Sequence, residues 1–453
     1  MKKKILFLFL VLSVVSCKKP AKIEPVDEKD WYAGGGQTFF DQSSGAFSND
    51  FNGLDGTLEA THGTGDAMFD ATFITAPSPI NEGLGPVFNA VSCASCHAND
   101  GRSEAPSEGE LINKLLLRIS VPGEGSHGEP LEVPGFGIQF HPKGVFGTPA
   151  EGDVSVSYSY VSGTYADGTS YELRIPNFSI QNTYIPFPSN AVFSPRLSRP
   201  VFGLGLLEAI PDWALLANED VFDSNQDGIS GKANYVWDRK SQSTTLGRFG
   251  WKAGSPNLLQ QVSFALSEDI GVTNFLFPLE SSYGQSQYVD NGKEISDSLV
   301  YALAFYMKTL GVPARRNVTD PDVIKGKQLF GEASCIKCHV PKQQTKINVA
   351  FSQLSNQTIY PYTDLLLHDM GSGLADSRKE YQAEGYEWRT PPLWGIGLTE
   401  VVNGHSNFLH DGRARSLSEA ILWHSGEAEN AKLYFKSMSA SDRAALIKFL
   451  KSL

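Results

Sequence analysis

Two copies of the pattern C-x-x-C-H constrain this chain more than any other feature of its sequence. They lie in the stretches VSCASCHANDG and ASCIKCHVPK, and their residues are Cys93, Cys96, His97, Cys335, Cys338 and His339. In this pattern the two thiols add to the vinyl groups of a haem, and the adjacent histidine ligates the iron. We therefore expect two covalently bound haem c groups, with His97 and His339 as axial iron ligands.

Other uses of four cysteines account for the pattern less well. The chain has five cysteines, and only Cys17 lies outside the two motifs. The other four cysteines could form a tetrahedral zinc site, two disulfides or a redox-active dithiol. None of these three alternatives needs a histidine directly after the second cysteine, and both motifs have one.

The chain also contains an internal repeat. Each motif has a phenylalanine five residues before its first cysteine, Phe88 and Phe330, and each is followed far downstream by a similar apolar segment. These segments are LAFYMKTL at Leu303–Leu310 and LIKFLKSL at Leu446–Leu453, and both have helical periodicity. An early helix, C-x-x-C-H, a variable loop, a distal ligand and a closing helix make up the plan of a cytochrome c domain. We therefore predict a mainly α fold of two cytochrome c-like domains.

The two repeats differ in length, which predicts the domain organisation. The first domain is expected at residues 34–313 and the second at 314–453. The longer first domain is expected to carry an insertion at about 120–285, rich in loops and β structure. Within it, DVSVSYSYVSGTYADGTSYELRI alternates around an Ala-Asp-Gly turn, which predicts a β-hairpin without catalytic residues.

The N-terminus has the features of an export signal. MKKKILFLFLVLSVVSC combines a basic start, an apolar run and a small residue before Cys17. This segment, residues 1–17, resembles a bacterial lipoprotein signal, which implies that Cys17 is lipidated. A plain signal peptide with a chance cysteine is the alternative. Residues 18–33 are expected to form a polar tether, and Lys18 after Cys17 favours an outer-membrane anchor facing the periplasm.

The loop DSNQDGISGKAN resembles the start of a calcium-binding EF-hand loop. Asp223, Asn225 and Asp227 occupy positions 1, 3 and 5 of the loop, and Gly228 occupies position 6. Position 12 holds Asn234 instead of the bidentate glutamate. The loop therefore predicts either calcium binding or an Asp-Gly turn closed by side-chain hydrogen bonds.

A series of motifs in order resembles the bacterial di-haem oxidoreductase family, whose members are described as peroxidases. The motifs are GLGPVFNAVSCASCH, RPVFGLGLLEAIP, DSNQDGISGKANYVWD, LGRFGWKAGSPNLLQQ, LLLHDMGSGLAD, EWRTPPLWGIG and FLHDGRARSLSEAILWHSGEA. The resemblance runs from about Gly34 to the C-terminus. The C-terminal motifs are also distantly similar to bacterial di-haem cytochrome c peroxidases and methylamine-pathway di-haem enzymes. The resemblance implies two haem groups and redox activity.

The resemblance also suggests roles for residues near the C-terminal motif. In di-haem peroxidases a ligating methionine often precedes His-Asp-Gly, but Leu409 stands there in this chain. Met370 is the first candidate for the distal iron ligand, with His368 and His410 as rivals. Arg389 and Arg413 are expected to bind haem propionates. Trp251 is a candidate electron relay between the haems, or a packing residue.

The ligand on the distal side of the N-terminal haem is left open by the sequence. Met68, His62, His127 and His141 could supply it, or the iron could have an open position. The candidates for a distal acid–base residue are His127, His141 and Glu132.

The expected function is transfer of electrons between two haems, with reduction of hydrogen peroxide at the N-terminal one. A small donor such as a cytochrome c is the expected partner, and the formal net charge of −12 disfavours nucleic acid. The alternatives are a membrane-anchored electron carrier without its own catalysis, and an oxidase or dioxygenase of an organic or protein substrate.

Overall fold

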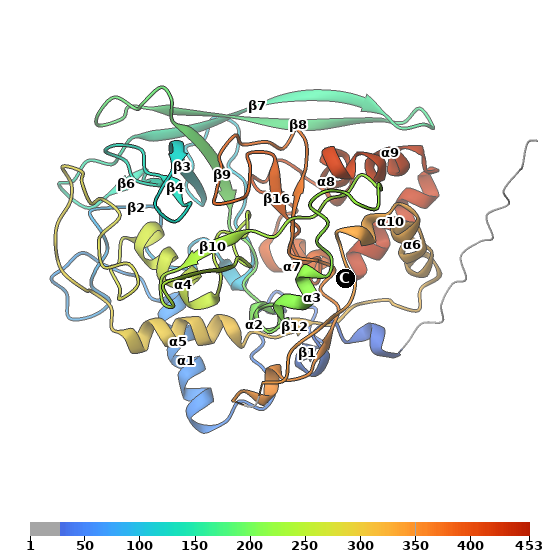
Figure 1. The fold of residues 1–453 in the computed structure, drawn as a ribbon, viewed down its shortest axis with the longest axis horizontal. Helices are drawn as coiled ribbons and strands as arrows, with labels where there is room; N and C mark the ends of the chain where they lie inside the picture. Colours follow the sequence, from blue (N-terminus) through green and yellow to red (C-terminus); the bar gives the residue numbers. More distant parts are fainter. Residues whose placement is uncertain (1–27, 349) are drawn as a thin grey trace, which may run out of the picture.

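The computed structural model describes residues 28–348 and 350–453 (Figure 1). Its α-helices are α1 (Gly56–Asp70), α2 (Leu204–Glu208), α3 (Asp212–Leu216), α4 (Leu258–Ala265), α5 (Asp297–Lys308), α6 (Pro321–Glu332), α7 (Thr399–Asn403), α8 (Leu417–Trp423), α9 (Glu429–Ser437) and α10 (Ala440–Ser452). A π-helical turn, Leu266–Ile270, continues directly from α4. Short 3₁₀ turns follow or overlap the two C-x-x-C-H motifs at Ala98–Asp100 and Cys335–Lys337.

The strands form one four-stranded sheet and several two-stranded ones. The four-stranded sheet is centred on β3 (Leu115–Glu124), which pairs antiparallel with β4 (Pro130–Leu131), β5 (Gln139–Phe140) and β9 (Val192–Leu197). The two-stranded pairs join β1 (Thr38–Phe39) to β12 (Val312–Pro313), β2 (Val87–Phe88) to β6 (Lys143–Gly144), β7 (Asp153–Thr164) to β8 (Ser170–Gln181), β10 (Tyr235–Asp238) to β11 (Ser243–Leu246), β13 (Gln343–Gln344) to β14 (Thr358–Ile359) and β15 (Leu367–Asp369) to β16 (Glu387–Arg389).

The predicted mainly α fold class is wrong. The structure is 27% helical and 20% strand, with several small sheets, so it is a mixed fold. The longest strands, β3, β7 and β8, lie between the two motifs, where the sequence alternates polar and apolar residues. The cytochrome plan predicted from the motifs therefore describes the surroundings of each motif and leaves out the β structure between them.

Two similar pairs of helices flank the two motifs. Helix α1 packs against α5, and α6 packs against α10. A Cβ added to Gly65 of α1 would lie 2.6 Å from the Cβ of Tyr306 on α5. A Cβ added to Gly326 of α6 would lie 2.6 Å from the Cβ of Phe449 on α10. Both crossings therefore need a glycine, because only a residue without Cβ allows the backbones to approach this closely.

The same two crossings orient the motif histidines. The ring centroids of Phe69 and His97 are 6.1 Å apart, and those of Phe330 and His339 are also 6.1 Å apart. The structural counterpart of Phe330 is therefore Phe69. The sequence alignment of Phe88 with Phe330 was wrong, because Phe88 lies in β2, in a loop-rich segment that separates α1 from the first motif.

A second repeated feature lies against the C-terminal ends of the closing helices α5 and α10. Gly203 and Gly395 both have φ of 70°, and each begins a short G-x-G segment. A Cβ on Gly205 would clash with the carbonyl of Lys308 at the end of α5, and one on Gly397 with the carbonyl of Lys451 at the end of α10. The predicted internal repeat thus has a structural basis beyond the motifs themselves.

The long β-hairpin predicted within the insertion is confirmed. Strands β7 and β8 pair from Asp153↔Gln181 to Thr164↔Ser170. The hairpin runs along one edge of the molecule, from the region of β3 to that of α8 and α9 (Figure 1). Its turn reaches the C-terminal helices, where Arg443 donates to Asp167 over 2.8 Å.

The predicted domain boundaries stay a prediction. A buried cluster around α1 and α5 also contains Trp394, Leu398 and Val402, which belong to the C-terminal part of the chain. The proposed signal, Cys17 and most of the tether lie outside the described residues. Within the described residues, no helix is both long and apolar enough to cross a membrane.

The helix crossing gives a direct test with a matched control on the same helix. Gly65→Ala should lower the free energy of unfolding of the holoprotein by about 1–3 kcal/mol, because the added methyl overlaps α5. Gly63→Ala should be neutral or slightly stabilising, because a Cβ there has nothing within 4 Å. Chemical denaturation of both variants would show the difference, and equal stabilities would contradict this account of the crossing.

Candidate functional site

The imidazole of His97 is fixed in one orientation. Its Nδ1 lies 2.8 Å from the carbonyl oxygen of Arg199, so this nitrogen carries the proton and donates it. Ser198 donates its hydroxyl hydrogen to the carbonyl oxygen of Cys96 over 2.6 Å, which holds the motif in place. Burial lowers the pKa of His97, which keeps the ring neutral. Nε2 is then left with its lone pair available to a metal.

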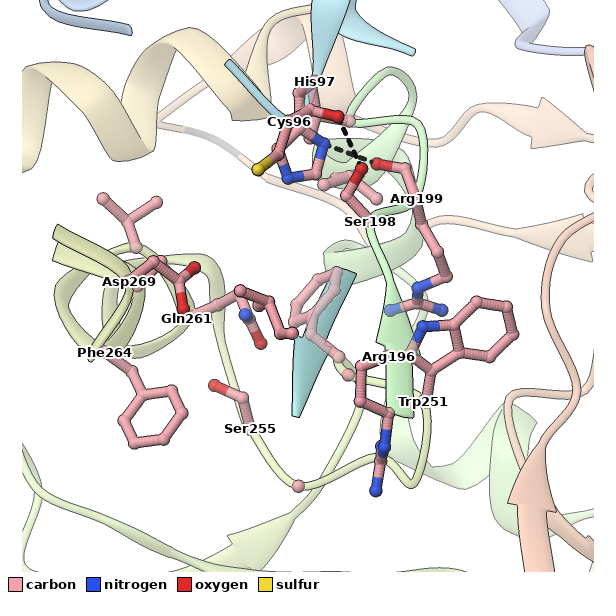
Figure 2. Close-up of a pocket in the computed structure, with 18 of the residues that line it drawn as sticks. Cys96, His97, Arg196, Ser198, Arg199, Trp251, Ser255, Gln261, Phe264 and Asp269 are labelled. Carbon is pink, nitrogen blue, oxygen red and sulfur yellow. Dashed lines mark hydrogen bonds between the residues drawn. The ribbon is translucent and has the colours of Figure 1, made fainter. Parts of the chain in front are cut away.

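His97 faces a large cavity. The cavity has a volume of about 410 Å³ and is also lined by Cys93 and Cys96. Figure 2 shows His97 on one side of it, and Ser255, Gln261 and Phe264 across from it. The helix α4 and the π-helical turn after it supply much of this opposite wall.

The cavity is strongly basic. Its lining contains the arginines Arg102, Arg118, Arg196, Arg199, Arg239, Arg378 and Arg389, against the acids Glu129, Glu132, Asp269 and Glu380. Three of these arginines have a buried nitrogen without a hydrogen-bond partner: Arg102 Nε, Arg118 Nη1 and Arg378 Nε. Buried donors without acceptors cost free energy, so the cavity is suited to a large apolar group that carries carboxylates.

Of the residues predicted for the distal side of the N-terminal haem, only one lines this cavity. Glu132 lines the cavity, but His62, Met68, His127 and His141 do not. His127 is exposed and stacks on Trp237 with ring centroids 3.7 Å apart. His62 lies on α1, with Nδ1 2.7 Å from the hydroxyl of Thr309. Apart from His97, the described lining residues include no histidine.

His141 instead belongs to a buried ion pair behind the cavity wall. Its Nδ1 lies 3.2 Å from Glu151 Oε1, and its Nε2 lies 2.8 Å from the carbonyl oxygen of Glu268. Both ring nitrogens face acceptors, so the ring is held as an imidazolium. Burial opposes that charge, but the carboxylate of Glu151 outweighs it and raises the pKa of His141 to about 8. His141 thereby holds the π-helical turn that carries Asp269 into the cavity lining.

The second motif has the same histidine geometry. His339 Nδ1 lies 3.1 Å from the carbonyl oxygen of Tyr362, and burial lowers the pKa of His339 to about 3. The surroundings are more aromatic than those of His97. Trp388, Trp423 and Phe408 belong to the buried cluster here, and the buried Nε1 of Trp423 has no hydrogen-bond partner.

Of the ligand candidates for this second site, two histidines are engaged elsewhere. His368 lies between Asp364 and Glu427, with ring nitrogens 2.9 Å and 2.6 Å from their carboxylates. Burial opposes its charge, but these carboxylates raise the pKa of His368 well above its ordinary value. His410 stacks on Trp388 with ring centroids 3.9 Å apart, and its Nε2 lies 3.5 Å from Asp411. Met370 is half-buried against the same cluster.

The two arginines predicted to bind propionates lie in different places. Arg389 lines the His97 cavity, where burial lowers its pKa to about 9. Arg413 pairs with Asp411 over 2.7 Å and lies 4.7 Å from the ring centroid of Trp423. Trp251 connects the two regions, because it lines the cavity and its ring lies 6.5 Å from that of His410.

The four motif cysteines do not support the alternative sites. All four are free thiols, and burial raises the pKa of Cys93, Cys96 and Cys335 to about 12, so these thiols are neutral. A redox-active dithiol would need a lowered pKa. In the described part of the chain, no three His, Cys, Asp or Glu residues are grouped to hold a metal ion, so a four-cysteine zinc site does not form.

The predicted calcium loop is closed by its own hydrogen bonds. Asp223 Oδ1 accepts from the amides of Asp227 and Gly228, over 2.9 Å and 3.1 Å, and Asn225 Oδ1 accepts from Asp227. Asp227 also accepts from Lys337 over 2.8 Å. This geometry matches the Asp-Gly turn alternative, and calcium binding stays a prediction.

Several residues of these sites were missed from the sequence. Arg196, Arg378 and Glu380 form buried ion pairs in the cavity wall, and Lys252 is fully buried on Asp376. His424 lies at the end of α8, in the motif ILWHSGEA. A lysine or arginine in a glycine-rich stretch such as RFGWKAGS is the sequence feature that could indicate a buried charge. The sequence alone does not show which of these charges become buried.

Comparison with known proteins defines the class of this protein. Residues 29–453 match the family model described as "Di-haem oxidoreductase, putative peroxidase". The chain therefore belongs to this family, and it is an oxidoreductase whose cofactors are haem groups. The resemblance predicted from the ordered motifs is confirmed.

Two further comparisons add little to this assignment. A chain of hydrazine synthase from Kuenenia stuttgartiensis aligns with 99% of this chain and 100% of its own length, at 13% identity and a TM-score of 0.37. A likeness of this size supports no conclusion about fold or activity. A search of curated proteins found no match.

The geometry of both motifs fits haem. Each histidine has Nδ1 bonded to a carbonyl and a neutral ring, and each motif has two free thiols. The unpaired arginine nitrogens in the first site and the unpaired Trp423 Nε1 in the second are donors suited to propionates or other acceptors. The residues present can therefore hold one haem beside each motif.

The His141–Glu151 pair predicts a dependence of stability on pH. The pKa of His141 is raised from 6.5 to about 8 by folding, so its stabilising effect is complete below pH 6.5 and is lost as pH rises through about 8. Glu151→Gln should remove this component of the pH profile. Denaturant midpoints of both proteins, measured between about pH 6 and pH 9, would show this difference. The same dependence of midpoint on pH in both proteins would contradict the role of the His141–Glu151 pair.

Proposed function

We propose that this protein is an exported, lipid-anchored enzyme with two covalently attached haem c groups that reduces hydrogen peroxide at its N-terminal haem. The C-terminal haem receives electrons from a donor and passes them on. The observation that carries the proposal is the cavity beside His97. His97 is oriented to bind iron on one side of this cavity, and the described residues of the opposite wall include no histidine.

An open position beside the N-terminal motif is supported by the chemistry of the cavity wall. Ser255, Gln261 and Phe264 lie across from His97, and none of these side chains is a strong iron ligand. The lining also includes Met307 of α5, a helix that packs on both α1 and α4. The wall formed by Ser255, Gln261 and Phe264 leaves space for a small oxidant across from His97.

Haem supplies the one-electron steps of peroxide chemistry, which protein side chains cannot perform. Reduction of one hydrogen peroxide molecule consumes two electrons and two protons, breaks the O–O bond and yields two water molecules. The chain's own contribution is to bind peroxide and to hold protons. The Tyr381 hydroxyl keeps its proton at neutral pH, because burial raises its pKa to about 12, and Gln261 offers an amide donor.

Trp251 is placed to connect the two sites. It lines the cavity beside His97, and its indole donates to the carbonyl oxygen of Leu197 over 2.8 Å. From its ring the contact continues to His410 and then to the stacked ring of Trp388, which lies in the C-terminal cluster. These aromatic contacts support the predicted role of Trp251 as an electron relay.

Two features of the sequence support the proposed location and donor. The export signal predicted at residues 1–17, with lipidation predicted at Cys17, supports a location outside the cytoplasm. The formal net charge of −12 suits a small basic electron carrier, such as a cytochrome c, whose approach would be steered by charge and weakened by salt.

Removal of one pair of cysteines at a time tests the proposal. The variant with Cys93→Ser and Cys96→Ser should carry one haem c in place of two and lose peroxide reduction, because the cavity then lacks its iron. The variant with Cys335→Ser and Cys338→Ser should also carry one haem, and should lose turnover with a protein donor. The measurements are haem content by pyridine haemochrome and peroxide consumption.

Cys17→Ser is the matched control for these variants, because it leaves both motifs intact. It should keep two haems and full activity while shifting the protein from the membrane to the soluble fraction. Two haems in either double variant would contradict covalent attachment, and unchanged peroxide consumption without the first haem would contradict its role.

A further inference from the structure

Three of the nine histidines share one unusual hydrogen-bonding pattern. His97, His339 and His424 each have Nδ1 bonded to a backbone carbonyl, and no partner on Nε2 among the described residues. For His424 the partner is the carbonyl oxygen of Ala420, 2.7 Å away. The first two are the histidines of the C-x-x-C-H motifs, so His424 has the geometry of an iron ligand without belonging to either motif.

The position of His424 corresponds to the cavity wall of the first site. Helix α4 begins after Asn257, whose side chain accepts from the amide of Gln260, and α8 begins after Ser416, which accepts in the same way from Glu419. Helix α4 is followed by α5, which packs on α1. Helix α8 is followed by α9 and then by α10, which packs on α6. When the two caps are aligned, Phe264 corresponds to Trp423 and Ala265 corresponds to His424. Phe264 and Ala265 both line the cavity opposite His97.

Contacts around His424 place it near the second motif. Cys338 Sγ lies 3.6 Å from His368 Nδ1, and that nitrogen lies 2.6 Å from Glu427 in the turn that follows His424. The neighbouring Trp423 has a buried Nε1 without a partner. Near His339 there are therefore side-chain nitrogens, His424 Nε2 and Trp423 Nε1, that have no partner among the described residues.

We propose that His424 is the second axial ligand of the iron bound by His339. This inference rests on the covalent haem attachment proposed above. His424 takes the place of the earlier candidates. Met370 has no comparable fixed geometry, and both ring nitrogens of His368 face carboxylates. His410 stacks on Trp388, with its Nε2 3.5 Å from Asp411.

The correspondence also explains how one chain could hold two different haems. Where the C-terminal half has His424, the N-terminal half has Ala265, whose methyl group cannot bind iron. The C-terminal haem then has two histidine ligands and transfers electrons, and the N-terminal haem keeps an open position for a substrate.

The test is the electron paramagnetic resonance spectrum of the oxidised, full-length holoprotein. In the native protein one haem should give a low-spin signal of two histidine ligands. His424→Ala should remove that signal and increase the high-spin signal, and added imidazole should restore a low-spin signal by filling the space left by the side chain. Both variant and native protein should contain two haems per chain by pyridine haemochrome.

Further variants make the outcome decisive. His424→Met should keep a low-spin C-terminal haem but raise its reduction potential, because a thioether ligand favours the ferrous state. Met370→Leu and the exposed-site variant His127→Ala should leave the spectrum unchanged. An unchanged low-spin signal in His424→Ala, or its loss in Met370→Leu, would overturn the assignment. Fewer than two haems in the native protein would instead contradict the proposed covalent attachment.

Discussion

The close crossing of two helices beside each motif is the contact on which the rest of the structure depends. At Gly65 and at Gly326 the backbone of one helix lies against the backbone of its partner, and a methyl group would not fit. This approach carries Phe69 and Phe330 to the same distance from the two motif histidines. The carbonyls of Arg199 and Tyr362 then complete the orientation of each ring. One packing arrangement used twice therefore gives the two motif histidines the same orientation.

The sequence predicted the motifs, the family, the closing helices and the β7–β8 hairpin, because each has a local signature. Spacing identifies C-x-x-C-H, and alternation identifies the hairpin. The fold class was wrong because the strands that surround β3 pair across large sequence separations, as Leu115 does with Leu197. The spacing to the first cysteine pairs Phe88 with Phe330 and misses Phe69, because the segment between helix and motif is longer in the N-terminal half. Distance along the chain from the first motif does not reveal that His127 lies on the surface and that His141 belongs to a buried ion pair.

The two halves differ in what surrounds the motif that they share. The N-terminal half carries the segment that adds β3, β9 and the π-helical turn, and with it a cavity wall rich in arginine. The C-terminal half is short, and aromatic side chains surround its motif. Desolvated arginines favour anionic groups and polar chemistry, whereas an aromatic surrounding excludes water. The environments therefore suit different tasks for the same cofactor.

The β7–β8 hairpin fixes the spacing of the two halves. Its base pairs through Ser155 with Leu111 near the first motif, and further along Arg174 donates to the carbonyl oxygen of Gly412 over 2.8 Å. Its turn is held by Arg443 on α10. A hinge motion between the halves would have to break these contacts together. The separation between the two motif histidines, over which an electron would pass from one haem to the other, is therefore set by the fold.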